Sequence, residues 1–196
     1  MLKNIDSLQV VQQKEWAESF TGFETRNRYT INDSKGVNLG LASEHSGSLI
    51  LRLILKSKRA FKMTIMDNKN EVLLELHRPF TFILSEMEVR DKNGQLAGTI
   101  QQKFRLLEKA LEVFDYNGNL LFQLKGPFWR PWTFKILENQ IEVGLITKKW
   151  SGFFKEAITT ADNFGAQFPV EWDFIKKAMA LPAIFLIDFV YFEKNN

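Results

Sequence analysis

A short turn recurs along the middle of the chain and limits the folds that are open to it. The segments 67–70 (DNKN), 91–94 (DKNG) and 115–118 (DYNG) begin 24 residues apart, and 138–140 (ENQ) falls almost on the next interval. Asn and Gly adopt positive φ easily, and such pairs between apolar runs are the strongest local signal for a β-hairpin. The spacing therefore predicts a series of antiparallel hairpins.

The residues around these turns alternate between apolar and polar. Phe61, Met63 and Ile65 share one face of a predicted strand, with Lys62 and Thr64 on the other. The same alternation sets Met87 and Val89 against Glu86, Glu88 and Arg90, and Leu111 and Val113 against Glu112. A period of two with one polar face is typical of antiparallel strands. Either a duplicated unit or hairpins of similar length would explain the regular spacing.

We expect this meander to curl and close into a barrel, because closure removes exposed sheet edges. A propeller is disfavoured because each of its blades takes roughly 40–45 residues. A chain of 196 residues fits one domain, which we place at 1–196.

The segment 178–192 (AMALPAIFLIDFVYF) is apolar on every helical face, with Asp188 as its one charge. Such a helix lies either in a protein interior or in a bilayer. Fifteen residues span about 22 Å, less than the ~30 Å hydrocarbon layer, and Pro182 and Asp188 also disfavour lipid. We therefore expect the helix to fill the barrel, with Asp188 bonded to a donor.

Composition excludes several functions. The chain has no Cys and only two His, which excludes disulfides and cysteine nucleophiles and disfavours a histidine metal site. The net charge of +3 is low for a dedicated nucleic-acid binder. Since no nucleophile elbow, phosphate-binding loop or metalloprotease motif is found, we expect no enzyme activity. The N-terminus does not read as a signal peptide, so a cytoplasmic protein is expected, with peripheral membrane association.

Several longer motifs resemble the phospholipid scramblase family. They are 12–16 (QQKEW), 20–25 (FTGFET) with 27–29 (NRY), 149–152 (KWSG), 161–169 (ADNFGAQFP) and 185–189 (FLIDF). The resemblance runs from about Leu8 to Glu193 and implies the fold of the Tubby C-terminal domain. That fold is a closed antiparallel barrel of about twelve strands around a central hydrophobic helix. Unlike the animal members, this sequence has no proline-rich N-terminal extension, and 78–85 (RPFTFILS) stands where they carry a cysteine cluster.

The resemblance also implies a calcium segment over residues 160–171. Read as an EF-hand-like loop, it has Thr160, Asp162 and Glu171 at positions 1, 3 and 12, with Asp173 as an additional candidate ligand. Phenylalanines occupy two positions that normally supply oxygen. We therefore expect calcium affinity to be weak. The alternative is a turn that only shapes the backbone before the helix.

Two groups of cations suggest an anionic surface as partner. The candidate lipid-binding residues are Lys56, Lys58, Arg59 and Lys62, and Lys148, Lys149 and Lys155. Aromatic residues near the second group suit a membrane interface, where cations meet anionic headgroups. The prediction is peripheral binding of anionic phospholipid or phosphoinositide. A solvated charged face, transbilayer lipid movement through a membrane-inserted C-terminal helix, and a DNA- or protein-interaction module are the alternatives.

Overall fold

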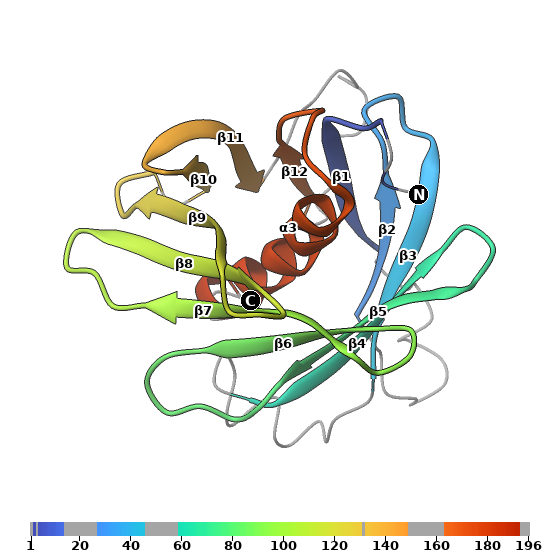
Figure 1. Cartoon of the computed structure of the whole chain (residues 1–196), viewed down its shortest axis with the longest axis horizontal. Helices are drawn as coiled ribbons and strands as arrows, with labels where there is room; N and C mark the ends of the chain where they lie inside the picture. The colour runs from blue at the N-terminus through green and yellow to red at the C-terminus, as the bar shows by residue number, and fades with distance from the viewer. Residues whose placement is uncertain are drawn as a thin grey trace, which may run out of the picture.

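The computed structural model of the chain describes residues 2, 4–13, 27–45, 59–130, 132–148 and 163–192. Within them, twelve antiparallel strands follow one another around a closed barrel, and β1 pairs with β12 to complete it (Figure 1). The strands are β1 (Ser7–Gln13), β2 (Arg28–Asn32), β3 (Asn38–Glu44), β4 (Phe61–Asp67), β5 (Val72–Arg78), β6 (Glu86–Asp91), β7 (Leu96–Lys103), β8 (Glu108–Asp115), β9 (Leu120–Pro127), β10 (Thr133–Glu138), β11 (Ile141–Lys148) and β12 (Asn163–Gln167). The predicted twelve-stranded barrel is confirmed.

An aspartate organises three of the predicted recurring turns, those at 67–70, 91–94 and 115–118. The Oδ1 atom of Asp91 accepts the backbone N–H groups of Asn93 and Gln95, and Gly94 has a positive φ of 77°. Asp67 and Asp115 make the same pair of bonds. The side chain thus replaces backbone partners that the tight turn cannot supply. Asp33 builds a fourth turn of this kind, which the regular spacing did not reveal.

The alternation of the strands places their apolar faces inside the barrel. Met87, Val89, Leu111 and Val113 are buried as predicted, and so are Phe61, Met63 and Ile65. Thr64 is an exception: it was expected on the polar face but is 7% exposed. His45 covers it, with the ring nitrogen Nε2 against the Thr64 hydroxyl.

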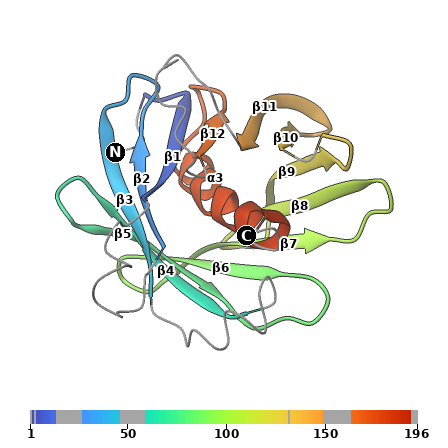
Figure 2. The same ribbon diagram turned by 180° about the vertical axis from the view of Figure 1, so that it is seen from behind.

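Helix α3 (Phe174–Ile187) runs through the barrel and continues into a short π-helical turn, η2 (Asp188–Phe192) (Figures 1 and 2). Residues 177–187 of α3 are all buried, including Pro182. Asp173 caps the helix by accepting the N–H of Lys176 at 2.8 Å. Among the described residues, no helix combines the length and the apolar content that crossing a membrane requires. The prediction of a helix buried in the barrel is confirmed.

Because successive strands are antiparallel, their connections alternate between the two ends of the barrel. We call one end the turn end: it carries the connections β2–β3, β4–β5, β6–β7, β8–β9 and β10–β11. The described connections β5–β6 (79–85), β7–β8 (104–107) and β9–β10 (128–130 and 132) lie at the opposite end, the loop end. Helix α3 starts at the turn end, where Lys176 pairs with Glu138, and η2 reaches the loop end, where Trp132 stacks on Phe192.

Candidate functional site

At the loop end, large apolar side chains of the connecting loops are exposed to solvent instead of packing in the core. Six of them have 72–87% of their surface in contact with solvent. The set comprises Phe80, Phe82, Ile83 and Leu84 in β5–β6, Phe104, Leu106 and Leu107 in β7–β8, and Phe128, Trp129 and Trp132 in β9–β10. Exposed apolar residues gathered on neighbouring loops mark an interaction surface, whereas isolated ones do not.

The base of the β5–β6 loop is held rigidly. Arg78, which is fully buried, donates from Nη1 to the backbone oxygen of Arg59 at 2.8 Å and from Nη2 to the Ser85 hydroxyl at 2.7 Å. Ser85 is in turn bonded to Gln102 of β7 through both its backbone N–H and its backbone oxygen. These bonds fix both ends of the loop, so that Phe82 and Ile83 project from a defined position.

The β9–β10 loop is attached to the C-terminal segment. The rings of Trp132 and Phe192 stack with centroids 5.2 Å apart and an interplanar angle of 9°. The neighbouring Trp129 remains 75% exposed. Arg130 in this loop and Arg105 in the β7–β8 loop are also exposed, so cations stand among the apolar side chains. Aromatic rings beside guanidinium groups are suited to a boundary between apolar and polar phases.

Beneath these loops, buried cations surround the aromatic C-terminal segment. Lys148 forms an ion pair with Asp188 at 3.3 Å, and the Tyr29 hydroxyl lies 3.4 Å from the other oxygen of this carboxylate. Arg59 pairs with Glu44 and lies 4.8 Å from the centre of the Phe189 ring. Cations near the carbonyl end of a helix interact favourably with its dipole. The expectation that Asp188 is bonded to a donor is met.

Burial shifts the pKa values of two neighbouring side chains, Lys109 and Tyr191. Lys109 lies 5.1 Å from the centre of the Tyr191 ring, and loss of solvent lowers the pKa of its ammonium group. Burial raises the pKa of Tyr191 to about 12. Both shifts follow from the cost of holding charge away from water.

Of the seven predicted lipid-binding cations, the structure describes three, and it does not bring them onto one surface. Lys62 is exposed on β4, near the loop end. Arg59 and Lys148 are 3% and 6% exposed and belong to the interior pairs just described, so neither presents its charge on the surface. Lys56, Lys58, Lys149 and Lys155 lie outside the described residues.

The apolar loops were not among the predicted site residues, although the sequence carries a signal for them. Short connections between strands are normally polar, whereas FTFIL at 80–84, FRLL at 104–107 and FW at 128–129 are apolar runs in such connections. The strand order of an antiparallel barrel puts them at one end.

The candidate calcium ligands fall partly outside the described residues, which do not include Thr160 or Asp162. Glu171 is exposed in the turn before α3, and the Asp173 carboxylate caps the helix. No group of three or more His, Asp or Glu side chains suited to a metal occurs in the part of the chain that the structure describes. Calcium binding stays a prediction.

Together these features define a class of protein: an antiparallel barrel filled by its own C-terminal helix, with an apolar loop end. The Scramblase family model matches residues 1–194, and the chain belongs to this family. Mouse phospholipid scramblase 1 is 36% identical over 210 aligned positions that include all of this chain and 63% of the mouse protein. Bovine phospholipid scramblase 2 is 34% identical and is matched over 71% of its length.

The chain thus spans less than two thirds of the mouse relative. Among solved structures, a protein from Arabidopsis thaliana matches over 95% of this chain and 92% of its own, with a TM-score of 0.48 and 13% identity. At this level of similarity, no property of that protein is carried over to this chain. The barrel is defined by the strand pairing of this chain itself.

Proposed function

We propose that this domain binds anionic phospholipid membranes peripherally, with the loop end placed among the lipid headgroups. The observation that carries the proposal is the gathering of ten large apolar side chains on three adjacent loops of the barrel. Removing one such side chain from water contributes roughly 1.5–3 kcal/mol when it is fully buried. Partial insertion of several side chains is therefore enough for reversible attachment.

Charge favours an anionic surface. Arg105, Arg130 and Lys62 are exposed at or near the loop end, against the exposed carboxylate of Glu86, and each cation near an anionic bilayer adds about 1 kcal/mol. The relatives named phospholipid scramblases support phospholipid as the ligand class. Helix α3 lies inside the barrel, so the proposed mode of binding is attachment at the membrane surface. We propose that the domain binds lipid without catalysis and that calcium modulates this binding weakly at most.

The test is sedimentation with vesicles of phosphatidylcholine alone or mixed with phosphatidylserine. The triple variant Phe82→Ser/Ile83→Ser/Leu106→Ser should lose about tenfold or more in vesicle affinity, because a tenfold change needs only 1.4 kcal/mol. Val37→Ser/Ile141→Ser removes exposed apolar side chains from the turn end and is the matched control. Equal binding by the two variants would refute the proposal. Tighter binding to duplex DNA than to vesicles at equal ionic strength would favour the nucleic-acid alternative.

A further inference from the structure

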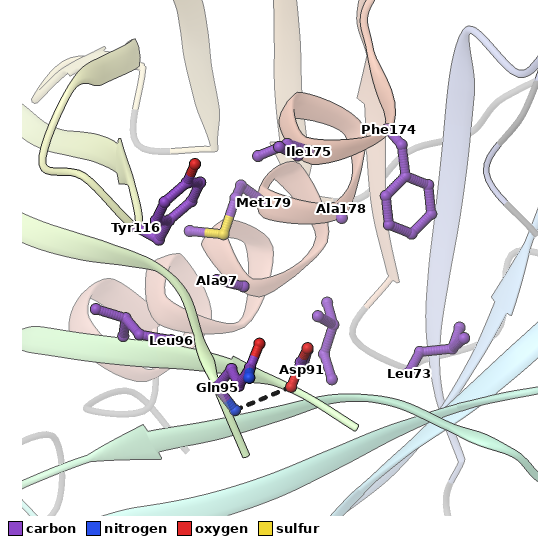
Figure 3. A pocket seen from close by; sticks show the side chains of 11 residues that line it. Leu73, Asp91, Gln95, Leu96, Ala97, Tyr116, Phe174, Ile175, Ala178 and Met179 are labelled. Atoms are coloured by element: carbon purple, nitrogen blue, oxygen red, sulfur yellow. Dashed lines mark hydrogen bonds between the residues drawn. The ribbon is translucent and has the colours of Figure 1, made fainter. Parts of the chain in front are cut away.

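The C-terminal segment is packed differently at its two ends. At the turn end, a cavity of about 320 Å³ lies between the start of α3 and the wall of β5, β6 and β7, and Phe174 is 62% exposed beside it (Figure 3). At the loop end, Phe189, Val190 and Phe192 of η2 are buried, and each aromatic ring of η2 contacts another ring. The segment is therefore fixed more closely to the barrel at the loop end than at the turn end.

Phe192 contacts the β9–β10 loop directly. Its side chain is 3% exposed, and its ring stacks on that of Trp132 with centroids 5.2 Å apart and an interplanar angle of 9°. Trp132 immediately precedes β10, and Trp129, three residues earlier in the loop, is 75% exposed. Stacking of two flat rings restricts both their distance and their relative tilt. The position of the exposed Trp129 therefore depends on Phe192.

Tyr191 is linked to the other two apolar loops. Its hydroxyl faces the Gln102 side chain of β7 and the backbone of Ala110 on β8, the two strands that carry the β7–β8 loop. The Oε1 atom of Gln102 in turn accepts the backbone N–H of Ser85, the last residue of the β5–β6 connection, at 3.0 Å. The phenol thus meets both strands beside the β7–β8 loop and reaches the end of the β5–β6 loop through Gln102.

Phe189 is linked to the start of the β5–β6 loop. Its ring stacks on Phe61, the first residue of β4, with centroids 4.0 Å apart, and the Arg59 guanidinium lies 4.8 Å from its centre. The backbone oxygen of Arg59 accepts a hydrogen bond from Arg78, the last residue of β5 before the loop. Residues of one short π-helical turn are therefore connected to all three apolar loops.

We infer that Tyr191 and Phe192 are positioning residues for membrane binding, because they hold the three apolar loops in fixed positions relative to one another. The inference rests on the proposed function, since it concerns how the same loop end meets a membrane. A loop that is already ordered loses less conformational entropy when it inserts, so vesicle affinity depends on the order that η2 imposes. π-Helical turns are frequent at functional sites.

The first measurement needs no lipid. A fluorophore is attached to Trp129→Cys or to Ile83→Cys, and time-resolved anisotropy reports the local motion of each loop. Phe192→Leu keeps an apolar side chain but removes the ring that stacks on Trp132, so fast local motion should increase at 129 and stay unchanged at 83. Tyr191→Phe keeps the ring but removes the hydroxyl, so motion should increase at 83 and stay unchanged at 129.

A double variant tests whether Tyr191 acts through Gln102. Gln102→Leu removes the side-chain link to Ser85 and to the Tyr191 hydroxyl together. At position 83, Tyr191→Phe/Gln102→Leu should therefore show no more motion than Gln102→Leu alone. Additive increases would contradict this route from η2 to the β5–β6 loop.

The second measurement is sedimentation with vesicles that contain phosphatidylserine. Phe192→Leu and Tyr191→Phe should each weaken binding by about fivefold. The control is Leu74→Ala, which truncates a buried side chain of the cavity wall and lowers stability more than an exchange of two large apolar side chains does. Leu74→Ala should leave the vesicle affinity and the motion of both loops as in the wild type.

The inference and the proposed function fail separately. Unchanged motion at 129 in Phe192→Leu, equal increases at 83 and 129, or the same weakening by Leu74→Ala would overturn the inference and leave the proposed function standing. Vesicle binding that the triple serine variant does not weaken would remove the proposed function, and the lipid-free measurement would still decide whether η2 positions the loops. Circular dichroism melting of each variant establishes that it is folded.

Discussion

The Lys148 ammonium lies 3.3 Å from the Asp188 carboxylate, joining the last residue of β11 to the first residue after α3. Both side chains are largely buried, with exposed fractions of 5% and 14%. The ion pair therefore holds the C-terminal segment against the barrel wall at the loop end. Its energetic coupling is open to measurement.

A double-mutant cycle with Asp188→Asn and Lys148→Met tests this coupling. Each single change should lower the free energy of unfolding, measured with urea, by about 2–3 kcal/mol, because the remaining charge stays buried after the other member of the ion pair has been removed. The double variant should cost at least about 1 kcal/mol less than the sum of the two. Additive losses would show that the pair contributes no coupling.

Gly98 should tolerate a side chain poorly. An added Cβ would lie 2.3 Å from the Phe114 carbonyl oxygen and 2.8 Å from the Met179 Cε. We expect Gly98→Ala to lower the free energy of unfolding by about 2–3 kcal/mol. The control is Gly118→Asn at a positive φ of 83° in open space, which Asn accepts at a cost under about 1 kcal/mol. Equal losses in the two variants would contradict the close packing of α3 on β7.

Tyr191 gives the protein a specific sensitivity to alkali. Burial raises its pKa to about 12, whereas a tyrosine in the unfolded chain ionises near 10. Because the unfolded state loses its proton first, stability should fall as pH rises from 10 towards 12, by at most about 3 kcal/mol. Tyr191→Phe should remove this part of the pH dependence. In the ultraviolet titration of the three tyrosines, the variant should also lack a component near pH 12.

Calcium should bind weakly, with a dissociation constant of about 10⁻⁴ M or higher. Asp173→Asn keeps the helix cap, so any loss of calcium affinity in this variant reports ligation rather than unfolding. Calorimetric titration of the wild type, Asp173→Asn and Asp162→Ala makes the measurement. Sub-micromolar binding that persists in Asp162→Ala would exclude the segment 160–171 as the site.

Most of the fold could be predicted from local sequence patterns. The turns at Asp67, Asp91 and Asp115 and the alternating strands could be predicted because hairpin geometry depends on adjacent residues. The turn at Asp33 could not be predicted from the regular spacing, because its sequence is DSKG and it lies 34 residues before Asp67, whereas the other turns are 24 residues apart. Thr64 is buried because His45 covers it, a contact between neighbouring strands that alternation alone does not specify.

The site was less predictable. Arg59 and Lys148 resemble surface cations in sequence, and their burial depends on Glu44 and Asp188, which are distant along the chain. The cavity depends on where α3 enters the barrel, which no local pattern determines. By contrast, the apolar loops follow from the sequence once strand order is known, because alternate connections of an antiparallel barrel share an end.

Membrane docking through the loop end can be measured directly because the chain contains no cysteine. Single variants Ile83→Cys and Ile141→Cys place one polarity-sensitive fluorophore at the loop end or at the turn end, at positions 87% and 68% exposed. On vesicles containing phosphatidylserine, the fluorophore at 83 should brighten and shift to the blue, while the one at 141 should keep its spectrum. A spectral change at 141 with none at 83, or no change at either position, would contradict the proposed orientation.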